Sequence, residues 1–359
     1  MIKRKTPGSN FWSGKRVFIT GHTGFKGGWL VTWLNLLNAK VYGLSLDPGT
    51  APAFFSLAQI SESLVRDFRE DIRDITKVKE IISVIRPDII FHMAAQPLVR
   101  TSYRDAPDTF TTNAIGTMNI LESLKETDSV KVAVMITTDK VYQNNEWPYP
   151  YREIDPLGGQ DPYSASKACA EMIINSYRAS FFPENSPSIS SVRAGNVIGG
   201  GDWSLDRLVP DAVRAFTSNS PLIIRKPMAT RPWQHVLDAL SGYLLLAEAQ
   251  WNHPKNFSGP WNFAPDLQGD CQVEFIASRL ADLWGKDAKV IISPSPDDPP
   301  EASSLRLDAS KARQFLDWRP AWTLEKTLEK TIEWYKTWQK GEDMKIVSER
   351  QISEYISEE

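Results

Sequence analysis

Short apolar runs alternate with amphipathic stretches between residues 15 and 197 of this chain. The apolar runs are rich in β-branched and aromatic residues and predict strands, whereas stretches with apolar residues three and four positions apart predict helices. The predicted strands cover 15–20, 39–46, 63–67, 88–94, 130–138 and 188–197. The predicted helices cover 26–38, 75–85, 113–126 and 161–180. This alternation is typical of a parallel sheet with helices on both faces.

We therefore predict an α/β fold, a Rossmann doubly wound parallel sheet with right-handed crossovers. After about residue 199 Gly, Pro and Trp become frequent, which indicates a smaller, mixed α/β C-terminal region. The predicted organisation is a Rossmann domain over 14–199 and a ligand-binding region over 200–340, with some segments returning to the Rossmann sheet. Residues 1–13 and 342–359 are expected to be mobile tails.

Composition and charge argue against several classes of partner. The chain has 359 residues, 42% of them hydrophobic, and a formal net charge of −3, so we expect no nucleic-acid or membrane-surface partner. No apolar run approaches the roughly 20 residues that cross a bilayer. Cys169 and Cys271 lie in unrelated contexts, which favours a reducing compartment over a disulfide framework or a metal site. These features predict a soluble, cytoplasmic protein without a metal.

A glycine-rich loop follows the first predicted strand, in the sequence VFITGHTGFKGGWL. Gly21 would allow the tight turn, Gly24 the approach of a pyrophosphate, and Gly27 close packing of helix on strand. The helix that follows offers free N–H groups to an anion, and Thr23 and Phe25 lie in the same loop. Glycines also make ordinary turns, but this placement after a strand predicts a dinucleotide site.

Residues after the next two strands fit the adenosine half of such a ligand. Asp47 could accept hydrogen bonds from the ribose hydroxyls and would repel a 2′-phosphate, which favours NAD over NADP. The alternative is a turn aspartate before Pro48 and Gly49. Asp71 could receive the adenine amino group, with Ile72 packed on the ring.

The fourth predicted strand ends in HMAAQ. Small Ala94 and Ala95 would let a flat cofactor pass close to the backbone there, and Gln96 follows them. A tight strand end without a ligand is the alternative.

Tyr163 and Lys167 are four positions apart, so they share a helix face. A phenol is a weak base near pKa 10, but a neighbouring ammonium and an oxidised nicotinamide both favour phenolate. Such a phenolate can take a hydroxyl proton while hydride leaves the same carbon. A surface Tyr–Lys pair would be the default interpretation. The glycine loop, and Thr138 at the end of an intervening strand, favour a catalytic pair instead.

The ordered motifs TGHTGFKG, DIRD, AAQ, TTDKVY and YSASK resemble the extended short-chain dehydrogenase/reductase superfamily over residues 14 to 340. Within it the chain is most similar to nucleotide-sugar 4,6-dehydratases, and the overall similarity favours those that act on CDP-D-glucose. The resemblance implies NAD as the cofactor and a homodimer or homotetramer. It also implies bacterial deoxysugar biosynthesis for surface polysaccharide such as lipopolysaccharide O-antigen.

The resemblance also implies roles for the residues after the fifth strand. Tyr163 takes the proton of the hexose 4-hydroxyl, with Thr138 and Lys167 holding the geometry. Asp139 protonates the departing C6 hydroxyl. Lys140 stands where related dehydratases carry glutamate, and it is the expected base for the C5 proton. Alternatively Lys140 only pairs with Asp139 or stabilises the enolate, and water or Tyr163 takes that proton.

The sequence gives less specific predictions for the residues that would bind the substrate. The resemblance places Asn196 at the sugar nucleotide, and Arg231, Arg225 and Arg100 are candidates for its phosphates. A structural salt bridge is the alternative for each arginine. A dehydratase for another nucleotide hexose, a nucleotide-sugar 4-epimerase and a non-catalytic NAD-binding sensor remain rival functions.

Overall fold

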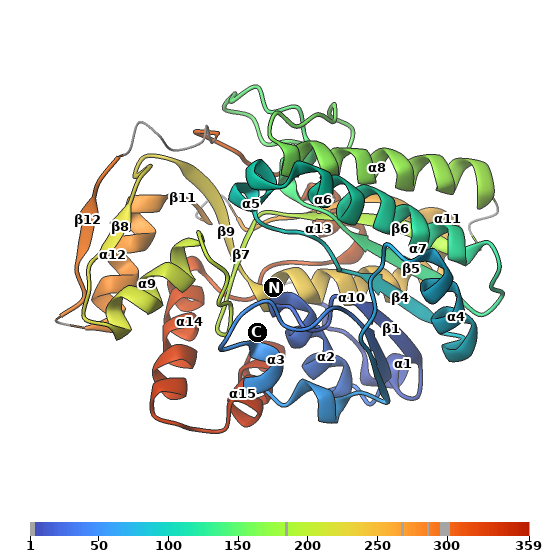
Figure 1. The fold of residues 1–359 in the computed structure, drawn as a ribbon, viewed down its shortest axis with the longest axis horizontal. Helices are drawn as coiled ribbons and strands as arrows, with labels where there is room; N and C mark the ends of the chain where they lie inside the picture. The colour runs from blue at the N-terminus through green and yellow to red at the C-terminus, as the bar shows by residue number, and fades with distance from the viewer. Residues whose placement is uncertain (1–3, 184–185, 267–268, 286, 295–301, 359) are drawn as a thin grey trace.

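A parallel β-sheet lies at the centre of the computed structural model, which describes residues 4–183, 186–266, 269–285, 287–294 and 302–358 (Figure 1). Within these residues seven strands pair in the order β10-β6-β5-β4-β1-β2-β3, and every pairing in this sheet is parallel. The strands are β1 (Arg16–Thr20), β2 (Lys40–Leu44), β3 (Arg66–Phe68), β4 (Ile89–His92), β5 (Val132–Ile136), β6 (Ser188–Ala194) and β10 (Gly259–Phe263). The predicted α/β class is confirmed.

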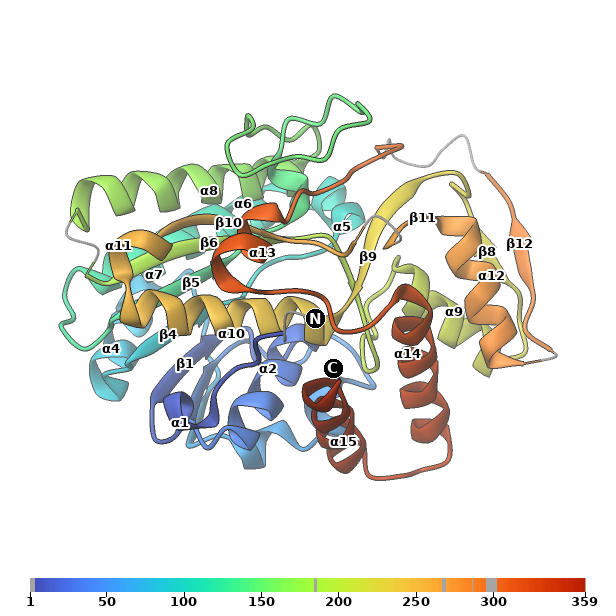
Figure 2. The same ribbon diagram turned by 180° about the vertical axis from the view of Figure 1, so that it is seen from behind.

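Helices cover both faces of this sheet (Figures 1 and 2). In β1, Val17 and Ile19 join the buried cluster that contains α2 (Phe25–Leu36) and α10 (Val236–Asn252). Phe18 lies between them and joins the cluster of the opposite face. The helices on that face are α4 (Ile75–Ile85), α7 (Gly116–Leu124) and α8 (Pro162–Phe181). Neighbouring strand residues point to opposite faces, so a strand covered on both sides is mostly apolar, as β1 and β5 are.

The strand order reverses beside β1, which has β2 on one side and β4 on the other. In open α/β sheets a ligand binds at the carboxyl ends of the strands at such a reversal. The turns after β1, β4 and β5 are the segments that carry the predicted site residues. The topology therefore brings these separate segments to one edge of the sheet.

A smaller region lies beside this edge (Figure 1). Its strands are β7 (Asn196–Ile198), β9 (Thr230–His235) and β11 (Asp270–Gln272) in one sheet and β8 (Leu222–Ile224) and β12 (Val290–Ile292) in another. Helices α9 (Leu208–Thr217) and α12 (Val273–Trp284) pack with them. The chain returns to the large sheet through β10, which pairs with β6.

The single strand predicted over 188–197 is wrong, because β6 and β7 belong to different sheets. The change of direction falls at Gly195, where a Cβ atom would lie 2.4 Å from Pro232. Backbone that passes this close to another chain segment requires glycine.

The prediction of mobile tails is corrected at both ends. Residues 344–357 form α15 (Met344–Ser357), and Ile352 and Tyr355 on it are fully buried. At the other end α1 (Ser9–Trp12) buries Trp12, whose indole N–H donates to Glu248 on α10 at 2.8 Å. Both terminal segments therefore belong to the packed structure.

The remaining helices are short or lie at the edges. The predicted helix over 113–126 corresponds to α7 together with the end of the π-helical turn η2 (Thr111–Ile115), which runs directly into it. Two short helices, α5 (Val99–Arg104) and α6 (Ala106–Phe110), precede this turn. The others are α3 (Phe54–Leu57), η1 (Ile60–Ser63), η3 (Asp139–Val141), α11 (Pro254–Phe257), α13 (Ser310–Leu316) and α14 (Leu324–Gln339). Among the described residues, no helix is both long and apolar enough to span a bilayer.

Candidate active site

A cleft of about 880 Å³ opens between the carboxyl edge of the large sheet and the smaller region. The predicted site residues that line it are Phe25, Ala95, Arg100, Thr138, Asp139, Lys140, Tyr163, Lys167, Asn196, Arg225 and Arg231. Those that do not line it are Gly21, Thr23, Gly24, Gly27, Asp47, Asp71, Ile72, Ala94 and Gln96. The structure thus brings all five predicted catalytic residues and all four predicted substrate residues to one cleft.

The glycine loop between β1 and α2 has the geometry of a dinucleotide cradle. Gly21 has φ of +79°, and a Cβ atom there would lie 2.6 Å from the amide nitrogen of Ala94. A Cβ atom on Gly27 would lie 2.2 Å from the carbonyl oxygen of Gly21. Gly24 is the residue before α2 and is exposed. Only glycine fits at Gly21 and Gly27, and the free N–H groups of α2 face this loop. These residues therefore fit a dinucleotide pyrophosphate.

Beyond the loop, the residues near Asp47 form a small polar group. The Thr23 hydroxyl is 2.7 Å from that of Ser45 and donates to the carbonyl of Leu46 at 3.0 Å. The Asp47 side chain is 90% exposed, and its carboxylate lies 3.9 Å from Arg69. Asp47 is therefore accessible to a ribose hydroxyl, with a cation beside it that the sequence interpretation did not include.

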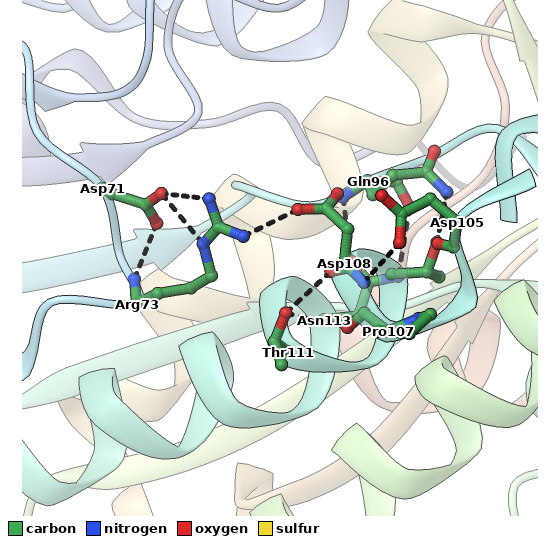
Figure 3. A network of polar contacts seen from close by, with 9 residues as sticks. Asp71, Arg73, Gln96, Asp105, Pro107, Asp108, Thr111 and Asn113 are labelled. Carbon is green, nitrogen blue, oxygen red and sulfur yellow. Dashed lines mark hydrogen bonds and ion pairs between the residues drawn. The ribbon is translucent and has the colours of Figure 1, made fainter.

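Asp71 is engaged by protein groups (Figure 3). Arg73 donates to it from the backbone at 2.8 Å and from the guanidinium at 2.6 and 2.9 Å. The same guanidinium donates to Asp108 of α6 at 2.6 Å. Burial acts to raise the Asp71 pKa, but the bonds from Arg73 outweigh it and hold the pKa below its ordinary value. Asp71 is thus a fixed carboxylate, and its contact with adenine stays a prediction.

Ile72 and Gln96 also have structural partners. Ile72 is 4% exposed and packs against Gly116 of α7, where a Cβ atom would lie 2.5 Å from its side chain. The Gln96 amide donates to Thr109 at 2.8 Å, and its backbone N–H donates to Asn113 at 2.9 Å (Figure 3). These contacts fix the turn after β4, which carries Ala95 into the cleft.

Thr138, Asp139 and Lys140 follow the end of β5, with Asp139 as the first residue of η3. The Thr138 hydroxyl donates to Asp139 Oδ1 at 2.8 Å, and its presence near Tyr163 acts to lower the pKa of that phenol. Lys140 Nζ lies 3.6 Å from Asp139 Oδ1. Asp139 is 1% exposed, and its Oδ2 has no hydrogen-bond partner within the described part of the chain. A buried carboxylate oxygen in a cleft without a partner is a candidate contact for a substrate hydroxyl.

Helix α8 fixes Tyr163 and Lys167 opposite these residues. It begins after Asp161, whose carboxylate accepts from the backbone N–H of Ser164 at 2.9 Å. One turn beyond Lys167, Glu171 is held by the guanidinium of Arg193 in a fully buried pair at 2.8 Å. Lys167 itself donates to the carbonyl of Ile136 at 3.3 Å. The helix is thus tied to β5 at Lys167 and to β6 one turn beyond it.

Electrostatics in this part of the cleft differ from the simple expectation. Burial raises the pKa of Tyr163 to about 12, although the bond with Thr138 and the charge of Arg207 act in the opposite direction. Burial and the charge of Lys26 lower the pKa of Lys167 to about 7. The sequence interpretation that a neighbouring ammonium makes Tyr163 acidic is therefore incomplete, because burial is the larger influence.

The substrate side contains paired charges. Asp206 lies 3.6 Å from Arg100 Nε and 3.5 Å from Arg225 Nη2, so one carboxylate joins both predicted phosphate ligands. Arg231 donates to the carbonyls of Thr230 at 2.9 Å and Ala302 at 2.6 Å. The alternative of a structural salt bridge thus describes a real contact of Arg100 and Arg225.

Sequence reasoning missed three cations of the cleft, Lys26, Arg207 and Lys226. Arg207 bonds Asp202 at 3.0 Å and lies close enough to Tyr163 and Lys26 to affect their protonation. Burial and Arg207 together lower the pKa of Lys26 to about 8. The sequence does contain an indication for Lys26. A cation in the first turn of a helix is unfavourable because it opposes the helix dipole, so its presence there suggests a functional role. No comparable signal marks Arg207.

The fold and this site can be compared with known proteins. The family described as GDP-mannose 4,6 dehydratase matches residues 18–331. The CDP-glucose 4,6-dehydratase of Salmonella typhimurium is 48% identical over 353 residues, which cover 97% of this chain and 98% of the relative. The dTDP-glucose 4,6-dehydratase of Haemophilus influenzae is 26% identical over 89% of this chain and 97% of the relative.

Among solved structures, a UDP-glucuronic acid 4-epimerase from Bacillus cereus, in complex with UDP-glucuronic acid and NAD, aligns with a TM-score of 0.78. It is 24% identical and covers 90% of this chain and 99% of its own. The dTDP-glucose 4,6-dehydratase DesIV from Streptomyces venezuelae, with NAD and TYD bound, aligns with a TM-score of 0.76 at 23% identity. It covers 89% of this chain and 97% of its own. At these identities the likeness shows the fold.

The doubly wound sheet, the glycine cradle and the Thr–Tyr–Lys group define an extended short-chain dehydrogenase/reductase. The match over residues 18–331 makes the assignment narrower. The chain belongs to the GDP-mannose 4,6-dehydratase family.

Proposed function

We propose that this protein converts CDP-D-glucose to CDP-4-dehydro-6-deoxy-D-glucose and water with NAD as its cofactor. The relative that is 48% identical over nearly the whole chain supports the substrate. The observation that carries the reaction type is Asp139, a buried carboxyl group with one oxygen that has no partner among the described residues. Its other oxygen accepts from Thr138, in the cleft that Tyr163 also lines. A dehydrogenase or epimerase needs no second acid beside the tyrosine.

The glycine cradle holds the pyrophosphate, and Asp47 accepts from the adenosine ribose. NAD held there would supply an acceptor for the C4 hydride and a donor of that hydride to C6. Tyr163 removes the proton of the 4-hydroxyl, and the Thr138 hydroxyl and Lys167 stabilise the phenolate. The unpartnered oxygen of Asp139 protonates the C6 hydroxyl, which leaves as water. The 1% exposure of Asp139 keeps solvent from competing for its proton.

Lys140 is the proposed base for the C5 proton. Its side chain is 29% exposed and its ammonium nitrogen lies 3.6 Å from Asp139, so both groups can reach the same face of the sugar. Elimination across C5 and C6 needs a base and an acid close together, and these neighbours supply them. Lys140 lines the same cleft as Tyr163 and Asn196, so its amine lies near the place where the sugar would bind.

On the substrate side we propose that Arg100, Arg225 and Arg231 lie along the diphosphate and that Asn196 contacts the sugar nucleotide. All four residues line the cleft. Guanidinium groups suit phosphate because they present several donors in one plane.

We also propose a homodimer or homotetramer in the cytoplasm that acts in deoxysugar biosynthesis for a surface polysaccharide. Helix α8 exposes Met172 and Phe181, at 53% and 48%, which are apolar positions that a second copy could cover. Analytical ultracentrifugation measures the assembly directly, and a purely monomeric species would refute this part.

The reaction is tested by incubating purified protein with CDP-D-glucose, dTDP-glucose and GDP-mannose separately and measuring product mass. Loss of one water from CDP-D-glucose alone is the expected result. A product of unchanged mass would identify a 4-epimerase instead, and NAD binding without any turnover would identify a sensor. Deuterium placed on C4 of the substrate should appear on the C6 methyl group of the product.

A further inference from the structure

Lys26 is a cation at the start of helix α2 that has no part in the reaction as proposed. It is the second residue of α2, no side chain caps this helix among the described residues, and its first turn contains no acidic residue. The N–H groups of a first turn carry partial positive charge, so a lysine at this position is repelled by its own helix. The position therefore costs stability unless an anion lies beside it.

The Lys26 side chain lines the cleft but makes no hydrogen bond or ion pair with any residue that the structure describes. The charges of Asp139 and Asp202 reach it, but each of these carboxylates has a nearer cation. Asp139 lies 3.6 Å from Lys140. Asp202 accepts from Arg207 at 3.0 Å. A charged amine that faces a cleft without a carboxylate of its own is suited to the anionic part of a ligand.

Lys26 lies where the glycine cradle meets the cleft. The three glycines of the cradle do not line the cleft, whereas Phe25 and Lys26, at the start of α2, do. The Cα–Cβ bonds of a helix tilt toward its N-terminus, so the Lys26 side chain leads toward the end at which an anion would bind. Tyr163 and Lys167, which would face the nicotinamide, line the same cleft. A dinucleotide with its pyrophosphate in the cradle must pass Lys26 to reach them.

We infer that the Lys26 ammonium binds the phosphate on the nicotinamide side of the NAD pyrophosphate. This role adds a charged side chain to the backbone N–H groups of the cradle, and it rests on the part of the proposed function that assigns NAD, not on the dehydration step. A hydrogen bond from an ammonium to a phosphate oxygen is about twice as strong as one between neutral groups. The anion also offsets the repulsion between Lys26 and its helix. Lys26 therefore destabilises the NAD-free protein and stabilises the complex.

The test measures the Kd of NAD by quenching of tryptophan fluorescence in the wild type, Lys26→Met, Lys26→Gln, Lys26→Arg and Lys255→Met. The Kd should rise by about 10-fold or more in Lys26→Met and Lys26→Gln, since a hydrogen bond to a charged group is lost. Agreement between these two variants guards against misfolding of either. Lys26→Arg keeps donors for phosphate and should stay within about 3-fold of the wild type. Lys255 is an exposed lysine outside the cleft, so Lys255→Met is the matched control and should bind NAD as the wild type does.

Two further measurements separate this role from a structural one. Without NAD, Lys26→Met should have a Tm about 1–3 °C above that of the wild type, because a cation is removed from the first turn of α2. The increase in Tm on addition of NAD should be smaller in this variant than in the wild type. ADP carries the phosphate on the nicotinamide side of the linkage, and AMP does not. Lys26→Met should therefore weaken ADP binding by about 10-fold and AMP binding by about 2-fold at most.

Several outcomes overturn the inference. Unchanged NAD affinity in Lys26→Met together with a lower Tm shows that Lys26 is structural. Unchanged NAD affinity with a raised KM for CDP-D-glucose assigns Lys26 to the diphosphate of the substrate. Equal losses for ADP and AMP place the contact on the adenosine side of the linkage. The proposed dehydratase fails separately: wild-type protein that binds NAD with the predicted dependence on Lys26 but releases no water from CDP-D-glucose refutes that function and supports the role of Lys26.

Discussion

On the sheet side of the cleft the reactive groups are buried, whereas on the side of the smaller region they are paired. Asp139, Tyr163 and Lys167 are all less than one tenth exposed and make few contacts with opposite charges. Across the cleft, Asp206 joins Arg100 and Arg225, whose side chains are 21% and 34% exposed. Burial shifts the pKa values of Tyr163 and Lys167 on the first side, whereas on the second side opposite charges lie in direct contact.

This difference matches two kinds of work. Acid–base chemistry needs groups whose two protonation states are close in free energy. Burial brings the pKa of Lys167 to about 7, but it moves that of Tyr163 further from neutral pH. Binding of a diphosphate needs permanent positive charge, which paired and partly hydrated arginines retain. The comparison predicts that changes on the sheet side reduce the rate of chemistry, while changes on the other side alter substrate affinity.

The largest effect is expected for Tyr163→Phe. The ring remains and only the hydroxyl is lost, so the 4-hydroxyl proton has no acceptor at hydrogen-bond distance. We expect kcat to fall by about 1,000-fold or more, with KM for CDP-D-glucose changed little. Tyr149→Phe, at an exposed position outside the cleft, is the matched control and should retain wild-type rates. A Tyr163→Phe variant with normal kcat and raised KM would show that Tyr163 contributes to substrate binding and not to the chemical step.

A smaller but still large effect is expected at Lys140. Lys140→Met should allow oxidation at C4, seen as cofactor absorbance at 340 nm, but should reduce C5–H exchange with deuterated solvent by about 100-fold. Lys140→Arg keeps the charge but cannot act as a base. Equal loss of exchange in both variants supports Lys140 as the base. Exchange that survives in Lys140→Arg and not in Lys140→Met assigns it to enolate stabilisation instead.

The sheet side is also the part that sequence predicts well. Glycines after a strand, and a Tyr–Lys pair four apart, owe their geometry to the local turn and helix, so spacing along the chain is sufficient. The helix over 161–180 and the strand before Thr138 were placed within two residues of α8 and β5. These elements carry the buried groups, whose chemistry follows from position on a helix or strand end.

What sequence could not predict depends on contacts between distant segments. Tyr355 in the supposed tail packs its ring 5.5 Å from Trp33, which is more than 300 positions earlier in the chain. The pairing of Asp206 with two arginines needs three separate segments to meet. Lys26 and Arg207 were missed for the same reason, because their role depends on the assembled cleft. The local sequence pattern carries no information about such long-range contacts.

On the paired side we expect Asp206→Asn to improve substrate binding. The carboxylate lies 3.6 and 3.5 Å from Arg100 and Arg225, and removing its charge weakens these contacts and makes the cleft more positive toward a diphosphate. Exposed pairs of this kind are weak, so KM should fall by about 2- to 5-fold with kcat unchanged. Asp128→Asn breaks a comparable exposed pair with Arg86 far from the cleft and is the control. A raised KM would show that Asp206 positions the arginines instead of competing for them.

The smallest expected effect concerns Asp270, an exception on the paired side. It lies 3.5 Å from Arg306, yet burial raises its pKa to about 6, with Arg306 opposing the shift. A carboxyl group with a raised folded-state pKa contributes stability below about pH 3.8, the ordinary value, and this contribution is lost as pH rises through 6. Asp270→Asn cannot titrate. The difference in Tm between wild type and variant should therefore be more favourable to wild type at pH 4.5 than at pH 7, by about 2–4 °C.

Differential scanning fluorimetry of both proteins across this range measures the difference directly. Titration confined to pH 4–6 would show that pairing with Arg306 does not keep Asp270 ionised once the group is buried. Burial would then be the main influence on Asp270 despite its ion pair. The ability of the arginines near Asp206 to bind phosphate would then depend on their exposure to solvent. A difference in Tm that stays constant with pH would instead mean that Arg306 fully compensates for burial. In that case pairing, not exposure, would account for the permanent charges of the substrate side.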